Sequence, residues 1–238
     1  MARFYLPPEA WEGDAALTGD EAKHLARVLR LKAGDRVVVF DGKGRRAEAV
    51  VRDIFRDRVS LEIGTLLPSA PPRPRIVLAQ AIPKGKTMDT IVQKAVELGV
   101  AAVQPLVTRN TVVVAGDEKS DKWRRTALEA CKQCGQDSLP EIGPPLAFDS
   151  WMAKQAGLPG LKIVASLAAG ALPMRQVLRA QAVPSEVVFL VGPEGDFTPA
   201  ETELALASGF IPVSLGHTVL RVETAALFGL AALTYEIA

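Results

Sequence analysis

Two glycine-ended segments near the end of the chain decide its fold: VVFLVGPEGDFTPAE, at Val187–Glu201, and PVSLGHTVLRVETAALFGL, at Pro212–Leu230. In each segment an apolar run stops at a glycine, and the loop that follows leads into a helical pattern. This form is typical of buried parallel strands followed by helices. Because open α/β sheets bind ligands beyond the carboxyl ends of their strands, we expect a ligand site built from these two loops.

The same alternation of apolar strands and amphipathic helices extends back to about residue 76. Thr198, Pro199 and Glu201 have the spacing of a capping box, which marks one helix start. The pattern predicts an α/β fold, in which a parallel sheet is covered by helices on both faces. The expected strands are 76–82, 101–107, 162–167, 187–191 and 211–215, and the expected helices are 88–98, 121–134, 150–156, 173–179, 198–208 and 222–237.

Residues 1–70 follow a different pattern, with short strands and one helix. This unit is expected to be a small β-barrel whose hairpin carries Lys43, Arg45 and Arg46 at its tip. Four prolines between Pro68 and Pro74 indicate an extended linker, so we expect two domains, 1–70 and 71–238. The expected elements of the first domain are strands at 3–6, 37–40, 47–54 and 59–63 and a helix over 21–31, with its cap at 18–20.

The composition is that of an ordinary globular protein, with 48% apolar and 23% charged residues. No apolar run is long enough for a membrane span, and acidic side chains stand where a signal peptide needs an apolar core. We therefore expect a cytoplasmic location and no membrane partner. Basic side chains exceed acidic ones by five in residues 1–140, whereas acidic ones exceed basic ones by four in residues 141–238. The basic part favours an anionic macromolecular partner, although a solvated charged face is the commoner cause of any one cluster.

Motifs for several other chemistries are incomplete. PKGKT, at Pro83–Thr87, resembles the end of a nucleotide phosphate loop, but Gln80 replaces the loop's first glycine, which excludes a nucleoside triphosphatase. A basic loop before a helix can still hold one nucleic-acid phosphate. Cys131 and Cys134 lack the further ligands that zinc needs, and their spacing late in a helical pattern favours two apolar side chains on one helix face. We expect no metal.

The two glycine-ended loops allow two interpretations. Gly192–Gly195 lacks the spacing of a dinucleotide fingerprint and is either a tight turn or a close backbone approach to a ligand. Leu215–Leu220 presents backbone amides and small apolar surface, which suits a planar heterocycle. Arg221 and Glu223 flank the start of an apolar helix, as a structural ion pair or as site residues. His217 is more simply explained as exposed than as a general base.

Taken together, these motifs resemble those of the SPOUT superfamily of knotted methyltransferases, and within it the RsmE family, which methylates N3 of a uridine in 16S ribosomal RNA. LTGDEAKHLARVLRLKAGDRVVVFDGKG, at Leu17–Gly44, resembles the family's PUA-like barrel. AIPKGKTMDTIVQKAVELGV, at Ala81–Val100, resembles the first strand and helix of its catalytic domain. VGPEGDFTPAE, at Val191–Glu201, and SLGHTVLRVETAAL, at Ser214–Leu227, resemble its two cofactor loops.

The resemblance implies S-adenosylmethionine as methyl donor, S-adenosylhomocysteine as product, a deep trefoil knot and a homodimer, with the last helix as the expected dimer contact. Arg221 would stabilise a uracil anion, and Glu223 would orient Arg221 or take the N3 proton. The implied cofactor-binding residues are Leu167, Gly192, Glu194, Gly195, Leu215, Gly216, Leu220 and Thr224. The implied RNA-binding residues are Arg27, Arg30, Lys43, Arg45, Arg46 and Lys84, and the implied partner is 16S ribosomal RNA or the small ribosomal subunit.

The sequence departs from the family pattern at several positions. Asp196 stands where a second glycine is frequent, and His217–Thr218 replaces a common Pro-Arg pair. Asn110 and Gln136 stand where arginines are usual, so the RNA path differs in detail, with Arg109 able to replace one of them. Two alternative functions stay open: methylation of a ribose 2′-hydroxyl or of another base, and a non-catalytic RNA-binding role in ribosome assembly.

Overall fold

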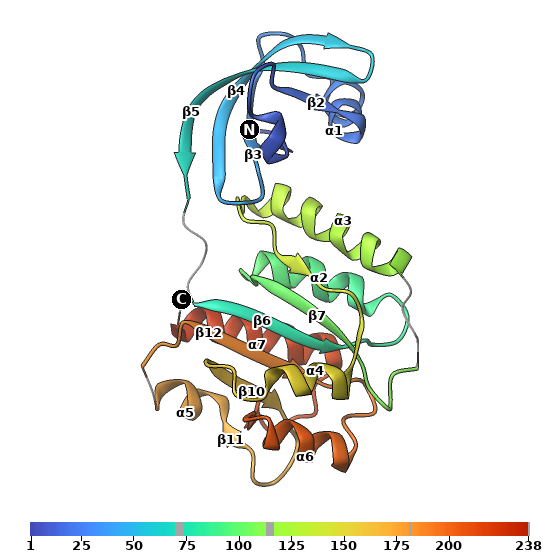
Figure 1. Cartoon of the computed structure of the whole chain (residues 1–238), viewed down its shortest axis with the longest axis vertical. Helices are drawn as coiled ribbons and strands as arrows, with labels where there is room; N and C mark the ends of the chain where they lie inside the picture. Colours follow the sequence, from blue (N-terminus) through green and yellow to red (C-terminus); the bar gives the residue numbers. More distant parts are fainter. Residues whose placement is uncertain (70–73, 113–116, 181, 238) are drawn as a thin grey trace. The chain divides into compact units, whose positions relative to one another are not determined.

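A computed structural model describes residues 1–69, 74–112, 117–180 and 182–237, which form two compact units (Figure 1). The first unit comprises Met1–Pro71 together with Cys131–Leu139, and the second comprises Pro72–Ala130 and Pro140–Ala238. Residues 131–139 therefore group with the first unit, although they follow the proline-rich segment in the sequence. Most of that segment, residues 70–73, lies outside the described residues.

The first unit is built on a five-stranded sheet in the order β1-β3-β4-β5-β2. Only β1 and β3 pair in parallel; the other neighbours are antiparallel. Ala47, Ala49 and Val51 are buried and alternate with less buried residues along β4, so they face a core that also holds Phe4 and Leu25. The elements are β1 (Arg3–Tyr5), η1 (Pro8–Ala10), β2 (Ala16–Thr18), α1 (Gly19–Lys23), η2 (His24–Val28), β3 (Arg36–Phe40), β4 (Arg45–Phe55) and β5 (Arg58–Pro68).

A buried ion cluster fixes residues 131–139 within this unit. The carboxylate of Asp137, with a side chain that is 3% exposed, accepts hydrogen bonds from Arg3 at 2.7 Å and Arg46 at 3.3 Å. Lys132 forms a second, largely buried ion pair with Glu21 at 2.7 Å. Except for the half-exposed Arg46, these charges are largely buried, and each is paired, which is the condition under which burial of a charge is tolerated.

The second unit contains an eight-stranded sheet, whose longest path runs β11-β13-β10-β12-β6-β7-β8 and whose β9 also pairs with β7. Every pair is parallel, which confirms the predicted α/β fold. The strands are β6 (Arg75–Ala81), β7 (Ala102–Val107), β8 (Glu141–Ile142), β9 (Leu146–Ala147), β10 (Leu161–Ala165), β11 (Leu172–Pro173), β12 (Glu186–Val191) and β13 (Ile211–Ser214). The helices are α2 (Thr87–Glu97), α3 (Asp117–Cys134), α4 (Phe148–Gln155), α5 (Met174–Arg179), α6 (Pro199–Ala207) and α7 (Val222–Ile237). The trefoil knot stays a prediction.

Helices cover both faces of this sheet. Aromatic residues of α4 and the residue Phe210 after α6 pack on Val188 and Leu190 of β12, whereas α2 and α7 lie against the opposite face. There α7 approaches β12 so closely that a Cβ at Gly229 would lie 2.2 Å from the ring of Phe189. The predicted capping box of α6 is present: the Thr198 hydroxyl accepts from the Glu201 amide, and the Glu201 carboxylate accepts from the Thr198 amide.

The two cysteines occupy different environments at the end of α3. Cys131 is buried, and burial raises the pKa of its thiol to about 12, whereas Cys134 is exposed. Of the two side chains expected on one helix face, only that of Cys131 therefore belongs to the core. Within the described ranges no group of three or more His, Cys, Asp or Glu side chains could hold a metal ion, and no helix is long and apolar enough to cross a membrane.

Replacing Asp137 with Ala should destabilise the first unit by about 3 kcal/mol, because it leaves the largely buried Arg3 guanidinium without its carboxylate. Asp121→Ala is the control, since Asp121 pairs with Arg124 on the exposed side of α3, in the second unit, and its replacement should cost less than about 1 kcal/mol. Native-state hydrogen exchange of the β3 and β4 amides measures the stability of the first unit in both variants. Equal protection in the two variants would contradict a stabilising role for the buried cluster.

Candidate active site

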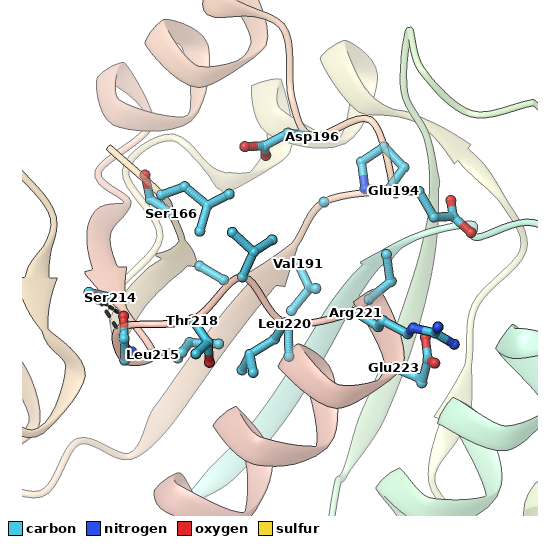
Figure 2. A pocket seen from close by; sticks show the side chains of 18 of the residues that line it. Ser166, Val191, Glu194, Asp196, Ser214, Leu215, Thr218, Leu220, Arg221 and Glu223 are labelled. Atoms are coloured by element: carbon cyan, nitrogen blue, oxygen red, sulfur yellow. Dashed lines mark hydrogen bonds between the residues drawn. The ribbon is translucent and has the colours of Figure 1, made fainter. Parts of the chain in front are cut away.

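A pocket of about 760 Å³ opens at the carboxyl end of the parallel sheet (Figure 2). Its volume lies in the range of small-molecule sites. Three strand ends supply its wall, and the first turn of α7 closes one side. The lining residues are Ala165–Ala168 after β10, Val191–Glu194 and Asp196 after β12, Ser214–Glu223 after β13, and in addition Thr87 and Ala225.

The order of the strands explains why a third loop takes part. β10 lies between β12 and β13, so the two predicted loops line one pocket without lying on neighbouring strands. The segment after β10 fills the space between them and contributes Ser166 and Leu167. The Ser166 amide donates to the Val213 carbonyl at 2.9 Å, which continues the β10–β13 pairing to the pocket wall.

The loop after β12 is shaped by close contacts. A Cβ at Gly192 would lie 3.2 Å from both Asp196 Oδ1 and Phe197 Cε2, so a larger residue would push the loop apart. Asp196 has a φ of 59°, and its carboxylate accepts from the Phe197 amide at 2.8 Å. Glu194 lines the pocket, and its Oε1 accepts from the backbone amide of Lys84 at 2.9 Å. The loop is therefore tied to the segment after β6.

The loop after β13 offers backbone groups and apolar surface. Gly216 has a φ of 139°, which glycine adopts without strain. The hydroxyl of Ser214 accepts from the Gly216 amide at 3.3 Å and can donate to its carbonyl at 3.2 Å, which closes a local turn. Leu215, Val219 and Leu220 line the pocket beyond this turn. Such a wall suits a planar heterocycle held through main-chain hydrogen bonds.

Arg221 and Glu223 stand at the start of α7 beside this loop, and Figure 2 shows both side chains extending to the same side of it. Arg221 is exposed and Glu223 half-buried. In the part of the chain that the structure describes, neither side chain takes part in a hydrogen bond or ion pair. The interpretation of the two residues as a structural ion pair therefore has no support, and both groups are available to a ligand.

The structure brings together most of the predicted cofactor residues. Leu167, Gly192, Glu194, Leu215, Gly216 and Leu220 line the pocket, together with Arg221 and Glu223. Gly195 and Thr224 do not: Gly195 faces the side chain of Asn110, and Thr224 points outward from α7. Sequence reasoning missed Thr87, Ser166, Asp196 and Ser214 among the polar lining residues. Ser166 directly follows β10 and Ser214 ends β13. Their position at predicted strand ends could therefore have indicated them.

The six predicted RNA-binding cations differ in whether they form ion pairs with carboxylates. Arg45 and Arg46 form ion pairs with buried carboxylates, those of Asp41 at 2.6 Å and Asp137 at 3.3 Å. Burial opposes ionisation of Asp41, but hydrogen bonds from Arg45 and from two backbone amides outweigh it and lower its pKa. Arg27 lies 4.0 Å from Asp57, with both side chains exposed. Arg30, Lys43 and Lys84 are exposed and, among the described residues, their side chains have no such partner.

Comparison with known families matches both units. Residues 70–234 match the family of RNA methyltransferase domains, and residues 17–64 match the family of RNA methyltransferase PUA domains. The fold and the pocket at its strand ends are thus those of an RNA methyltransferase with an N-terminal PUA domain.

Full-length relatives narrow this class. Ribosomal RNA small subunit methyltransferase E of Synechocystis sp. is 34% identical over 94% of this chain and 74% of its own length, and that of Bacillus subtilis is 26% identical over 93% and 90%. The crystal structure of the Neisseria gonorrhoeae enzyme of the same name, bound to S-adenosyl methionine, superposes with a TM-score of 0.88 and 31% identity over 99% of this chain and 97% of its own. The chain belongs to the ribosomal RNA small subunit methyltransferase E family, which confirms the resemblance drawn from its motifs.

Proposed function

We propose that this protein transfers a methyl group from S-adenosylmethionine to N3 of a uridine in 16S ribosomal RNA. The observation that carries the proposal is the pocket at the strand ends, with Arg221 and Glu223 at its edge and no competing partner for either side chain among the described residues. Its support is membership of a family whose named relatives act on ribosomal RNA of the small subunit, one of them solved with S-adenosyl methionine bound.

The donor set of the pocket fits this cofactor. Leu215, Val219 and Leu220 supply apolar surface for an adenine ring, next to the backbone groups of the β13 loop. The hydroxyls of Ser166 and Ser214 are suited to the ribose, and acidic side chains of the lining suit a ligand with a positively charged amino group. When bound, the cofactor would supply an electrophilic methyl group on its sulfonium.

The reaction requires a uracil anion, because N3 of uridine carries a proton and is a poor nucleophile until that proton leaves. Arg221 donates to a uracil carbonyl and stabilises the negative charge that develops on the ring. Glu223, in the first turn of α7, accepts the N3 proton, since among the described residues it makes no hydrogen bond that would hold Arg221. Because Arg221 and Glu223 lie at the same edge of the pocket, a uracil that contacts both is held with N3 toward the methyl donor.

Replacing Arg221 with Ala should lower kcat about a hundredfold or more, because it removes a donor aimed at developing charge, while the affinity for S-adenosylmethionine stays within a few-fold. Arg175→Ala, which removes an exposed arginine of α5 outside the pocket lining, is the matched control and should retain full activity. Nucleoside mass spectrometry of unmodified 16S RNA treated with each enzyme measures 3-methyluridine, and calorimetry measures cofactor binding.

Other products of this assay decide between the functions. A methylated ribose or a different methylated base would favour a knotted methyltransferase with another target. Absence of cofactor binding by the unaltered protein would favour a non-catalytic RNA-binding role. Full activity of the Arg221 variant would contradict the role assigned to that residue.

We place RNA backbone contacts on Arg27, Arg30 and Lys43 of the first unit and on Lys84 of the second. Their exposed cationic heads can release counterions from phosphates. Arg45 and Arg46 contribute less to binding than the sequence predicts, because each already neutralises a buried carboxylate. Ribosomal RNA would be met in the cytoplasm, which is the proposed location.

Replacing Arg30 should weaken RNA binding and reduce the slope of log affinity against log salt by about 1, the effect of one lost phosphate contact. Asn is the suitable substitution, because Arg30 has a φ of 54° and asparagine tolerates this conformation. Lys43→Ala should act in the same way. Arg46→Ala should leave the salt slope nearly unchanged and lower stability instead, and a slope change as large as that of Arg30→Asn would contradict this distinction.

We propose a homodimer through α7, on which an unpartnered face is exposed. Thr224, Phe228, Ala231 and Tyr235 recur at helical spacing on this face, and Phe228 and Tyr235 are 49% and 86% exposed. Two copies of such a face would bury each other's aromatic rings.

Phe228→Glu combined with Tyr235→Glu should therefore yield a monomer in analytical ultracentrifugation, because four carboxylates would meet in the interface. Phe55→Glu is the control: Phe55 is 69% exposed in the first unit, and its replacement should leave the mass unchanged. A dimer that persists in the double variant would place the interface elsewhere.

A further inference from the structure

The loop that follows β7 contacts the loop after β12, which we call the pocket loop (Gly192–Asp196). The side-chain amide of Asn110 donates one hydrogen bond to the Gly195 carbonyl and one to the Asp196 carbonyl, each at 2.9 Å. The Asn110 side chain also packs against Gly195, where a Cβ would lie 3.3 Å from it. One neutral side chain thus bridges two successive carbonyls of the segment that turns away from the pocket.

The β7 loop is itself held in place by hydrogen bonds to residues outside the pocket lining. The Thr108 amide and hydroxyl both bond to the Thr111 hydroxyl, at 3.0 and 2.9 Å, and the Thr111 amide donates to the Thr108 carbonyl at 3.1 Å. The Arg109 amide donates to Glu201 Oε1 at 2.8 Å, so the loop is anchored on the first turn of α6. Asn110 therefore projects from a fixed turn toward the pocket loop.

The segment that Asn110 holds needs such support. Asp196 adopts a left-handed φ of 59°, which a non-glycine residue adopts at a cost. Glu194 and Asp196 both line the pocket, on either side of Gly195. Glu194 is tied to the Lys84 amide on one side, and Asn110 ties the following two carbonyls on the other.

We infer that Asn110 is a positioning residue for the cofactor pocket, which acts by holding the Gly195 and Asp196 carbonyls so that the Gly192–Asp196 loop stays in its ligand-binding shape. The inference rests on the proposed function. At position 110 an arginine would present a positive charge, whereas Asn110 holds two backbone carbonyls. The amide suits this task because its two N–H groups face two acceptors.

The decisive comparison is Asn110→Asp with Asn110→Ala. Aspartate keeps the size and shape of the side chain but replaces the donors with oxygens that face two carbonyl oxygens. We expect the Kd and KM for S-adenosylmethionine to rise about tenfold in both variants, at least as much for Asp as for Ala, with kcat at saturating cofactor within about twofold of the unaltered enzyme. Arg109→Ala is the matched control, because Arg109 uses only its backbone amide in this contact and its exposed side chain should not affect cofactor affinity.

A measurement without cofactor separates this inference from the proposed function. Hydrogen exchange of the residue 194–197 amides should be about tenfold faster in Asn110→Asp than in the unaltered protein and unchanged in Arg109→Ala. If the unaltered protein fails to bind S-adenosylmethionine but this exchange still depends on Asn110, the proposed function is wrong and the positioning of the loop is supported. If exchange and affinity in Asn110→Asp equal those of the unaltered protein, the inference is overturned, since shape alone then suffices. A fall in kcat with unchanged KM would also overturn it.

Discussion

The packing of α7 directly against β12 is the contact on which the site depends. Gly229 allows the helix backbone to lie against the fully buried ring of Phe189, at a distance where any Cβ would collide with the ring. Arg221 directly precedes the same helix and Glu223 lies in its first turn, and both line the pocket. A rigid helix transmits its position along its length, so the depth at which α7 rests on the sheet sets where both side chains stand. The apolar contact between Gly229 and Phe189 thereby places Arg221 and Glu223, about two helical turns away. Among the described residues, neither of these side chains has a partner of its own.

The pocket loops are held by a different kind of force. Their backbone lies beyond the strand ends, where the ladder of sheet hydrogen bonds stops and each amide or carbonyl needs another partner. Side chains supply these partners: the Glu194 carboxylate accepts from the Lys84 amide, and the Asn110 amide donates to the Gly195 and Asp196 carbonyls. The site therefore combines a helix fixed by packing with loops fixed by individual hydrogen bonds. Single substitutions should affect the loops more locally than the helix, because each loop bond can be removed without opening the core.

Sequence reasoning recovers the parts of this structure that follow from local pattern. The continuous apolar runs give the parallel strands, and the capping box at Thr198 gives the start of α6 to the residue. Short elements such as β2 and β11 carry too few residues for a period to be read, and they are found only through their partners in space. The place of β10 between β12 and β13 depends on tertiary packing, so the contribution of Ser166 could not be derived from the two neighbouring loops alone. The same limit applies to Arg46, since its carboxylate partner lies ninety-one positions away in the chain.

Asn110 and Gln136, where the resemblance led us to expect arginines, make different contacts in the structure. Gln136 contributes its backbone carbonyl to Arg3, at 3.0 Å, a bond that any residue at this position could make. Asn110 contributes its side chain, and to two carbonyls that only a donor can satisfy. Substitution at position 136 should therefore leave that bond in place, whereas position 110 requires donors of short reach. Of the cations proposed to contact RNA, Arg30, Lys43 and Lys84 pair with no carboxylate within the described residues, and Arg27 lies 4.0 Å from Asp57 with both side chains exposed.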